Sequence, residues 1–371
     1  MSEIFNTKKP VTEYSEKNLF LAGEPGLIDT IHRPFPKIWD LYKEMKSLDW
    51  SEDEFNYSKC FTDFSTVDKD ISDMMLETIM WQWEADSIAS RFPLVLISPF
   101  QPCTEVIEAE QAIMTNELVH ANTYSEIIRM SFDNPQEVLE KMLAKSDSFN
   151  RLSLVNSTLE DFQKYSAAVN YHGLDYTDDV EVYTNLLVFY FTMILLERIQ
   201  FMASFAITFT ICKSGPFQPI GMSVKKIAQD ELEVHVEYRK QVVSEIIALD
   251  KEKFGGLILR NARPLLAELF NEVITKEMAW TDQLFEGRNL IGTNKELIKE
   301  WVLFNAKDVH RFIGFTKEEA SFSYPRLNPM PFLEDWFNMN AIQAAPQEQD
   351  VPAYKVNVIE NDDEDITFTD F

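Results

Sequence analysis

Two short segments of this sequence each carry a carboxylate and an imidazole at helical spacing. In the first, Glu117 precedes His120 by three residues, and in the second, Glu231 precedes His235 by four. Residues three or four apart lie on one face of an α-helix, so each pair can direct its two side chains at a common ion. Mixed oxygen and nitrogen donors suit iron or manganese better than zinc or calcium. The two pairs therefore predict a transition-metal site.

A single acidic residue lies on the helix expected before each pair, Asp86 before the first and Glu197 before the second. Each intervening segment is long enough to descend one helix, turn, and return along an antiparallel neighbour to the same height. Glu197 also lies within a strongly apolar stretch, where a carboxylate needs a charged partner or a metal. The arrangement predicts two helical hairpins that supply three ligands each to a pair of metal ions.

The prediction depends on the fact that the pair of an acid and a histidine occurs twice, because acidic residues are common in the chain. Asp and Glu make up 61 of the 371 residues, so a single acid and histidine pair would arise by chance. The remaining histidines show no matching pattern and are not expected to be ligands: His32, His172 and His310.

Apolar residues recur at helical spacing through most of the chain, and alternating strand patterns are scarce. No segment between residues 60 and 320 has the composition of a linker. We therefore expect an all-α protein in one domain over residues 1–340, and the paired ligands indicate a ferritin-like helical bundle with extra packing helices. The first 35 residues should follow its surface. Residues 186–212 are apolar enough for a membrane span, but Glu197, Arg198 and Gln200 at their centre indicate a buried core helix.

The formal net charge of −27 argues against nucleic-acid binding, which needs clustered Lys and Arg. Cys60, Cys103 and Cys212 are scattered and have no CxxC spacing, so neither a disulfide framework nor a structural zinc site is expected. The N-terminus lacks the features of a secretory signal. We expect a cytoplasmic protein.

Residues 341–371 differ in kind from the rest of the chain. They are polar, interrupted by proline and strongly acidic at the end, so they cannot bury enough apolar surface to order themselves. Ile366, Phe368 and Phe371 are apolar positions on this acidic background. We expect a flexible tail whose three apolar residues dock in a groove of another protein. The alternative is a tail that only increases solubility.

Taken together, these motifs resemble the small, radical-generating subunit of aerobic ribonucleotide reductase, of the iron-tyrosyl type. The resemblance extends from about Trp50 to Phe371. Its most specific element is segment 116–129, in which Tyr124 lies four residues beyond His120. Segments 195–205 and 227–231 and the Asn-Pro-Met-Pro-Phe sequence at 328–332 are similar to further family motifs.

The resemblance implies an oxo-bridged di-iron centre, although manganese can replace iron in related sites. Two ferrous ions would reduce dioxygen and oxidise Tyr124 to a stable radical. Phe201, Phe205 and Ile227 would line an apolar pocket that shields this radical. One iron would be bound by Asp86, Glu117 and His120, and the other by Glu197, Glu231 and His235, with some carboxylates bridging.

The resemblance also implies a route for the oxidising equivalent. Trp50 would lie near the metals, and Asp230 would link it to His120. Tyr354 would pass the oxidising equivalent to the large catalytic subunit, on which the tail docks and where ribonucleotides become deoxyribonucleotides. The small subunit would form a homodimer and would not bind nucleotide itself.

The sequence departs from the family pattern at two places. The second pair in the family is usually three residues apart, whereas here Val234 occupies the expected histidine position and His235 follows it. An extra residue within a helix is commonly absorbed as a π-bulge, so we predict one between Glu231 and His235. Asp49 stands where an aromatic residue commonly precedes the loop tryptophan.

Three other functions compete with this interpretation. A ferritin-like protein could store or oxidise iron without a radical, although such chains are usually shorter and lack a docking tail. A di-iron oxidase could act on a small molecule, in which case Tyr124 would be incidental. A helical scaffold without enzymatic activity would not need the paired ligands.

Overall fold

The computed structural model describes residues 18–23, 26–145 and 148–337. Within these ranges the chain forms helices and no strands, and Leu290 and Thr293 make an isolated antiparallel bridge. The predicted all-α, ferritin-like bundle is confirmed. The domain boundary predicted at residue 340 and the tail beyond it lie outside the described residues.

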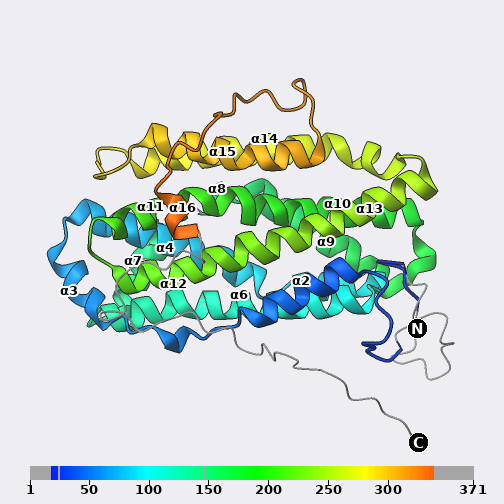
Figure 1. The fold of residues 1–371 in the computed structure, drawn as a ribbon, viewed down its shortest axis with the longest axis horizontal. Helices are drawn as coiled ribbons and strands as arrows, with labels where there is room; N and C mark the ends of the chain where they lie inside the picture. The colour runs from blue at the N-terminus through cyan, green and yellow to red at the C-terminus, as the bar shows by residue number, and fades with distance from the viewer. Residues whose placement is uncertain (1–17, 24–25, 146–147, 338–371) are drawn as a thin grey trace, which may run out of the picture.

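The helices are long in the centre of the chain and short at its connections (Figure 1). In order, the elements are α2 (Pro36–Ser47), η1 (Glu52–Glu54), α3 (Ser58–Thr66), α4 (Lys69–Ala89), α5 (Pro93–Ile97), η2 (Ser98–Phe100), α6 (Thr104–Ser131), α7 (Pro135–Lys145), α8 (Ser148–Arg151), α9 (Ser153–His172), η3 (Leu174–Tyr176), α10 (Asp179–Leu195), η4 (Leu196–Gln200), α11 (Phe201–Lys213), α12 (Gln218–Gln229), η5 (Asp230–His235), α13 (Val236–Leu249), η6 (Asp250–Phe254), α14 (Leu257–Leu284), α15 (Lys295–Ile313) and α16 (Leu333–Phe337).

Four helical rods form the centre of the bundle. They are α4, α6, the continuous run α10–η4–α11 and the continuous run α12–η5–α13. Helix α4 packs against α6 and α11, α10 packs against α13, and η4 meets η5. The hairpin of α14 and α15 covers α10 and α11, while α2 lies along α6 and α13 on another side (Figure 1).

Polar side chains fix where several of these helices begin. Asp178 accepts a hydrogen bond from the backbone N–H of Glu181 at the start of α10, and Asn294 accepts two at the start of α15. Such N-terminal caps satisfy backbone donors that have no partner within the helix. They set the starting points of two long core helices.

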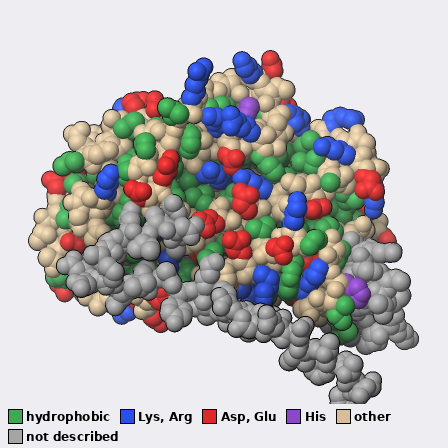
Figure 2. All heavy atoms as spheres, viewed as in Figure 1, with side chains coloured by type: hydrophobic (Ala, Val, Ile, Leu, Met, Phe, Trp, Pro, Cys, Tyr) green, Lys and Arg blue, Asp and Glu red, His purple; other side chains and the backbone are tan. Residues whose placement is uncertain are grey.

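The helical run Asp179–Lys213 is long and apolar enough to cross a membrane on composition alone. However, 94% of its most apolar 18-residue window is buried inside the protein. The core-helix interpretation is therefore confirmed. On the face shown in Figure 2, basic side chains lie among acidic ones rather than in one continuous basic patch.

The described part of the first 35 residues partly enters the core. Phe20 is completely buried, and its backbone carbonyl accepts a hydrogen bond from the Tyr183 hydroxyl at 2.7 Å. The backbone N–H of Leu21 bonds to the carbonyl of Phe100 at 2.8 Å. This segment is thus anchored between the ends of η2 and α10, while Leu27, Ile28 and Ile31 remain exposed.

Candidate metal centre

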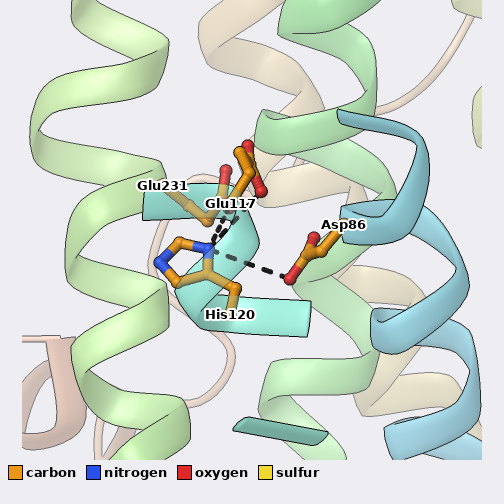
Figure 3. A group of neighbouring side chains, drawn as sticks. All are labelled: Asp86, Glu117, His120 and Glu231. Atoms are coloured by element: carbon orange, nitrogen blue, oxygen red, sulfur yellow. Dashed lines mark ion pairs between the residues drawn. The ribbon is translucent and has the colours of Figure 1, made fainter. Parts of the chain in front are cut away.

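Asp86, Glu117, His120 and Glu231 point toward one another inside the bundle (Figure 3). The Nδ1 atom of His120 lies 3.3 Å from Glu231 Oε1, 3.5 Å from Glu117 Oε2 and 3.8 Å from Asp86 Oδ2. One donor atom from each of the four residues lies within 4.8 Å of the other three. We call this group the first position.

Glu117, Glu197, Glu231 and His235 form a second group, again with donor atoms within 4.8 Å of one another. The Nδ1 atom of His235 lies 3.5 Å from Glu117 Oε1 and 3.6 Å from Glu231 Oε2. We call this group the second position. All six residues of the two positions are buried.

Glu117 and Glu231 belong to both positions, and each divides its two oxygens between them. Glu117 directs Oε2 toward His120 and Oε1 toward His235, while Glu231 directs Oε1 toward His120 and Oε2 toward His235. A carboxylate whose oxygens face two adjacent positions can bridge two cations. The geometry is that of a dinuclear centre rather than of two separate sites.

Helical geometry explains how the ligands are aimed. Asp86 lies on α4, and Glu117 and His120 share one face of α6 at three-residue spacing. Glu231 and His235 lie on the π-helical turn Asp230–His235, which brings residues four apart to the same site. The bulge predicted between these two residues is present. Glu197 also lies on a π-helical turn, Leu196–Gln200, which was not predicted from the sequence.

The donor set fits a pair of metal ions. Several polar atoms of the six residues are buried and have no hydrogen-bond partner in the described part of the chain: both oxygens of Asp86 and of Glu231, Oε2 of Glu117 and of Glu197, Nδ1 of His120 and both ring nitrogens of His235. An unsatisfied buried polar group costs about 1–3 kcal/mol, so such a cluster is expensive unless something binds it. Bound cations would satisfy these atoms together.

The protonation of the cluster reflects its burial and its mutual contacts. Burial raises the pKa of Glu197 to about 8, although the positive charge of Arg239 acts in the opposite direction. Burial alone would lower the pKa of His235, but the neighbouring carboxylates of Glu117 and Glu231 raise it to about 10. Burial and the charge of Glu117 hold the pKa of Asp86 well above its usual value. Metal binding must therefore displace protons from these groups.

Tyr124 is completely buried on α6, one helical turn beyond His120. Burial and the negative charges of Asp86, Glu231 and Glu117 hold its pKa well above the usual value for a phenol. The hydroxyl is therefore protonated, close to the ligand carboxylates and away from solvent.

Apolar residues flank the two π-helical turns. Phe201 directly follows Leu196–Gln200, Phe205 lies one turn later, and Ile227 lies three residues before Asp230–His235. All three side chains are buried, and the rings of Phe201 and Phe205 have centroids 5.3 Å apart. Their role in shielding a radical stays a prediction.

Trp50, Asp230 and His120 form a hydrogen-bonded chain that starts at the centre. The Trp50 indole donates from Nε1 to Asp230 Oδ2 at 2.8 Å, and the same oxygen lies 3.0 Å from His120 Nε2. The Trp50 and His120 rings have centroids 6.0 Å apart and are nearly parallel. Trp50 lies between α2 and η1, and 8% of its surface is exposed. This series of hydrogen bonds therefore connects His120, a candidate metal ligand, to the edge of the bundle.

The three other histidines contact groups away from the centre. His32 bonds to Asp29 at 2.6 Å, His172 stacks on Tyr176, and His310 lies among aromatic rings that include Tyr324. The remaining predicted site residues lie outside the described residues: Tyr354, Ile366, Phe368 and Phe371.

A buried ion pair that was not predicted from the sequence lies beside the second position. Arg239 donates from Nε to Glu197 Oε1 at 3.0 Å and from Nη1 to Glu110 Oε1 at 2.9 Å. Weak signals were present in the sequence. Arg239 follows His235 by one helical turn, and Glu110 precedes Glu117 by two turns on the same face of α6. Neither spacing alone distinguishes these residues from solvated charges.

Known proteins resemble this chain over most of its length. The family model for the small chain of ribonucleotide reductase matches residues 29–318. The ribonucleoside-diphosphate reductase subunit beta of Buchnera aphidicola from Acyrthosiphon pisum is 23% identical over 385 aligned residues, which cover 100% of both proteins.

Two solved structures share the fold. The ribonucleotide reductase R2 subunit from Clostridium botulinum has a TM-score of 0.73 at 17% identity, and the match covers 91% of this chain and 98% of that one. The dimanganese(II)-NrdF of Streptococcus sanguinis has a TM-score of 0.64 at 14% identity, with 84% and 99% covered. Because the family match covers most of the chain and includes all six candidate ligands, the protein belongs to the family of ribonucleotide reductase small chains.

Proposed function

We propose that this chain generates and stores the tyrosyl radical of an aerobic ribonucleoside-diphosphate reductase. Members of its family are oxidoreductase subunits that work with a large subunit. The observation that carries the finer assignment is the pair of shared carboxylates, Glu117 and Glu231, between two adjacent four-residue positions. In this proposal both positions bind iron, held by Asp86, Glu117, His120, Glu197, Glu231 and His235.

The residues around the centre suit oxidation of a phenol. A bound pair of metal ions would supply the redox chemistry and would take up one electron from a neighbouring side chain. Tyr124 is that group in our proposal. Loss of an electron makes a phenol a strong acid, and in our proposal the proton passes to Asp86, whose charge acts on the Tyr124 hydroxyl. Complete burial of Tyr124 keeps water and reductants away from the product.

The oxidising equivalent then leaves through Trp50. The indole N–H of Trp50 is hydrogen-bonded to Asp230, so the proton released when the indole is oxidised has an acceptor at 2.8 Å. Asp230 also contacts His120, which couples this step to the metal centre. We propose that Tyr354 continues the route to the large subunit and that Ile366, Phe368 and Phe371 anchor the tail there.

Three broader features complete the proposal. The protein acts as a homodimer, as the resemblance implies. It works in the cytoplasm, where the reduced state of its three buried free cysteines would be maintained. Iron is the proposed metal because a radical-bearing tyrosine favours it, although the relative from Streptococcus sanguinis is described as a dimanganese(II) protein.

The test is to load the protein with ferrous iron, admit air, and record metal content together with a low-temperature electron paramagnetic resonance spectrum. We expect two irons per chain and a tyrosyl radical signal. In Tyr124→Phe the iron should remain and the signal should disappear. Tyr57→Phe is the matched control, because Tyr57 is equally buried but its hydroxyl lies near Ser223, away from the ligands.

A radical signal that persists in Tyr124→Phe would reject Tyr124 as the carrier. Two irons without any radical in the wild-type protein would instead indicate a di-iron oxidase or ferroxidase. If manganese and not iron produces the signal, the choice of metal is wrong while the site assignment stands.

A further inference from the structure

Arg239 is a fully buried cation beside the second position. It lies on α13, one turn beyond His235, and none of its surface is exposed. Its guanidinium joins two carboxylates from different helices, Glu197 through Nε and Glu110 through Nη1. The Tyr238 hydroxyl donates to the same Glu110 oxygen at 3.0 Å. The group therefore links α6, η4 and α13 at one point.

The hydrogen bond from Arg239 makes the two oxygens of Glu197 different from each other. Oε1 accepts the hydrogen bond from Arg239 at 3.0 Å. Oε2 is buried and has no hydrogen-bond partner among the residues that the structure describes, and Glu197 belongs to the second position. One lone pair of Oε1 is thereby engaged, which leaves Oε2 as the freer oxygen for a metal ion. The hydrogen bond therefore favours one-oxygen coordination by Glu197.

Glu110 makes this arrangement electrostatically tolerable. An unpaired guanidinium beside two divalent cations would repel them, but the Arg239 and Glu110 pair adds no net charge to the site. The pair is nevertheless costly, because Arg239 Nη2 and Glu110 Oε2 are buried without a hydrogen-bond partner among the described residues. A buried ion pair with unsatisfied atoms is poor for stability. The Arg239 and Glu110 pair therefore needs another role, and the orientation of Glu197 by Arg239 is such a role.

We propose that Arg239, held in place by Glu110, is a positioning residue that keeps Glu197 a one-oxygen ligand of the second position. The proposal rests on the metal site proposed above. Each position has four protein donors. If Glu197 bound through both oxygens, it would occupy one further coordination place at the second position. Arg239 keeps that place available for dioxygen.

Binding of Co²⁺ alone tests this without any measurement of activity. The visible absorption of Co²⁺ falls stepwise as its number of ligands rises from four to five to six, so absorption per ion reports how many ligands surround it. The test variant is the double substitution Glu110→Gln with Arg239→Gln, which removes both charges and leaves neither buried alone. The matched control is Tyr238→Phe, which removes the hydrogen bond from Tyr238 to Glu110 but leaves Arg239 on Glu197.

We expect wild type and Tyr238→Phe to bind two Co²⁺ with equally strong absorption. The double variant should also bind two, but with a several-fold loss of absorption for the ion at the second position. Its metal-free melting temperature is recorded to show that it is folded. If it misfolds, Arg239→Lys, which keeps the charge but lacks the planar two-pronged geometry, should show the same loss.

An unchanged spectrum in a folded variant that binds two Co²⁺ would overturn the role of Arg239 and leave the metal site intact. Failure of the wild-type protein to bind two Co²⁺ would overturn the proposed metal site itself. The two failures are therefore distinguishable in one titration.

Discussion

At the scale of single residues, Asp230 joins groups that are remote in the sequence. One oxygen, Oδ2, accepts the Trp50 indole N–H and contacts His120 Nε2. The contact fixes the His120 ring with Nδ1 directed at the first position. Partners that orient a ligand histidine in this way contribute strongly to metal affinity.

We predict that Asp230→Ala weakens metal binding at the first position by about 10–100-fold, the usual cost of losing such a partner. An anaerobic titration with ferrous iron or Co²⁺ measures the change. Asp49→Asn is the control, because Asp49 acts on Asp230 through its charge, whereas the contact with His120 is made by Asp230. Equal affinities in Asp230→Ala and wild type would show that His120 does not need this support.

Residue identities were predictable where the sequence holds a local pattern. Glu117 with His120 and Glu231 with His235 are visible because both members of each pair lie on one helix. The sharing of Glu117 and Glu231 could not be predicted in detail, since it depends on how helices α6 and α12–η5–α13 approach each other. Arg239 was missed because its two partners come from other helices.

At the scale of elements, the π-helical turn Asp230–His235 absorbs one extra residue. The sequence predicted it because the turn separates two recognisable ligands. The turn Leu196–Gln200 was not predictable, because Glu197 is the lone ligand of its helix and no spacing reveals the insertion. A third such turn, Asp250–Phe254, carries no candidate ligand. Two of the three π-helical turns in the described chain therefore lie at the centre, as expected for functional sites.

Deleting Glu233 should convert the turn Asp230–His235 into regular α-helix while leaving the register of α13 unchanged. Glu233 is exposed, and its loss places Glu231 and the histidine three residues apart. We expect a folded protein that still binds two metal ions, with its melting temperature within a few degrees of wild type. Calorimetry and metal analysis check both points.

Deletion of Glu237 is the matched control, since it removes the same exposed residue type from the regular part of α13. There the loss must rotate either α13 or His235 by about 100°, so the metals or the fold should be lost. Metal retention in the Glu237 deletion together with metal loss in the Glu233 deletion would contradict this account of the turn.

At the scale of the whole molecule, composition and helical periodicity were sufficient to predict the fold class. They could not predict the covering of the bundle, because the hairpin of α14 and α15 shows no ligand pattern and its place over α10 and α11 depends on packing alone. The acidic tail was assigned from composition and lies outside the described residues.

Truncation after Gln343 should separate formation of the metal centre and radical from ribonucleotide reduction with the large subunit. The six candidate ligands and Tyr124 all lie earlier in the chain, so the metals and the radical should survive, while ribonucleotide reduction with the large subunit should be abolished. Radical spectra and a turnover assay test this. In the full-length chain, Tyr354→Phe should bind the large subunit and still fail in turnover. Normal turnover by the truncated chain would exclude a docking role for the tail.

The apolar run Asp179–Lys213 also affects how the protein is made. A ribosome completes this segment before it completes α13 and α14, the helices that pack on α10. During that interval the apolar surface of the nascent chain has no packing partner and is prone to aggregation. The period of greatest aggregation risk therefore ends only when α14 has emerged and docked on α10.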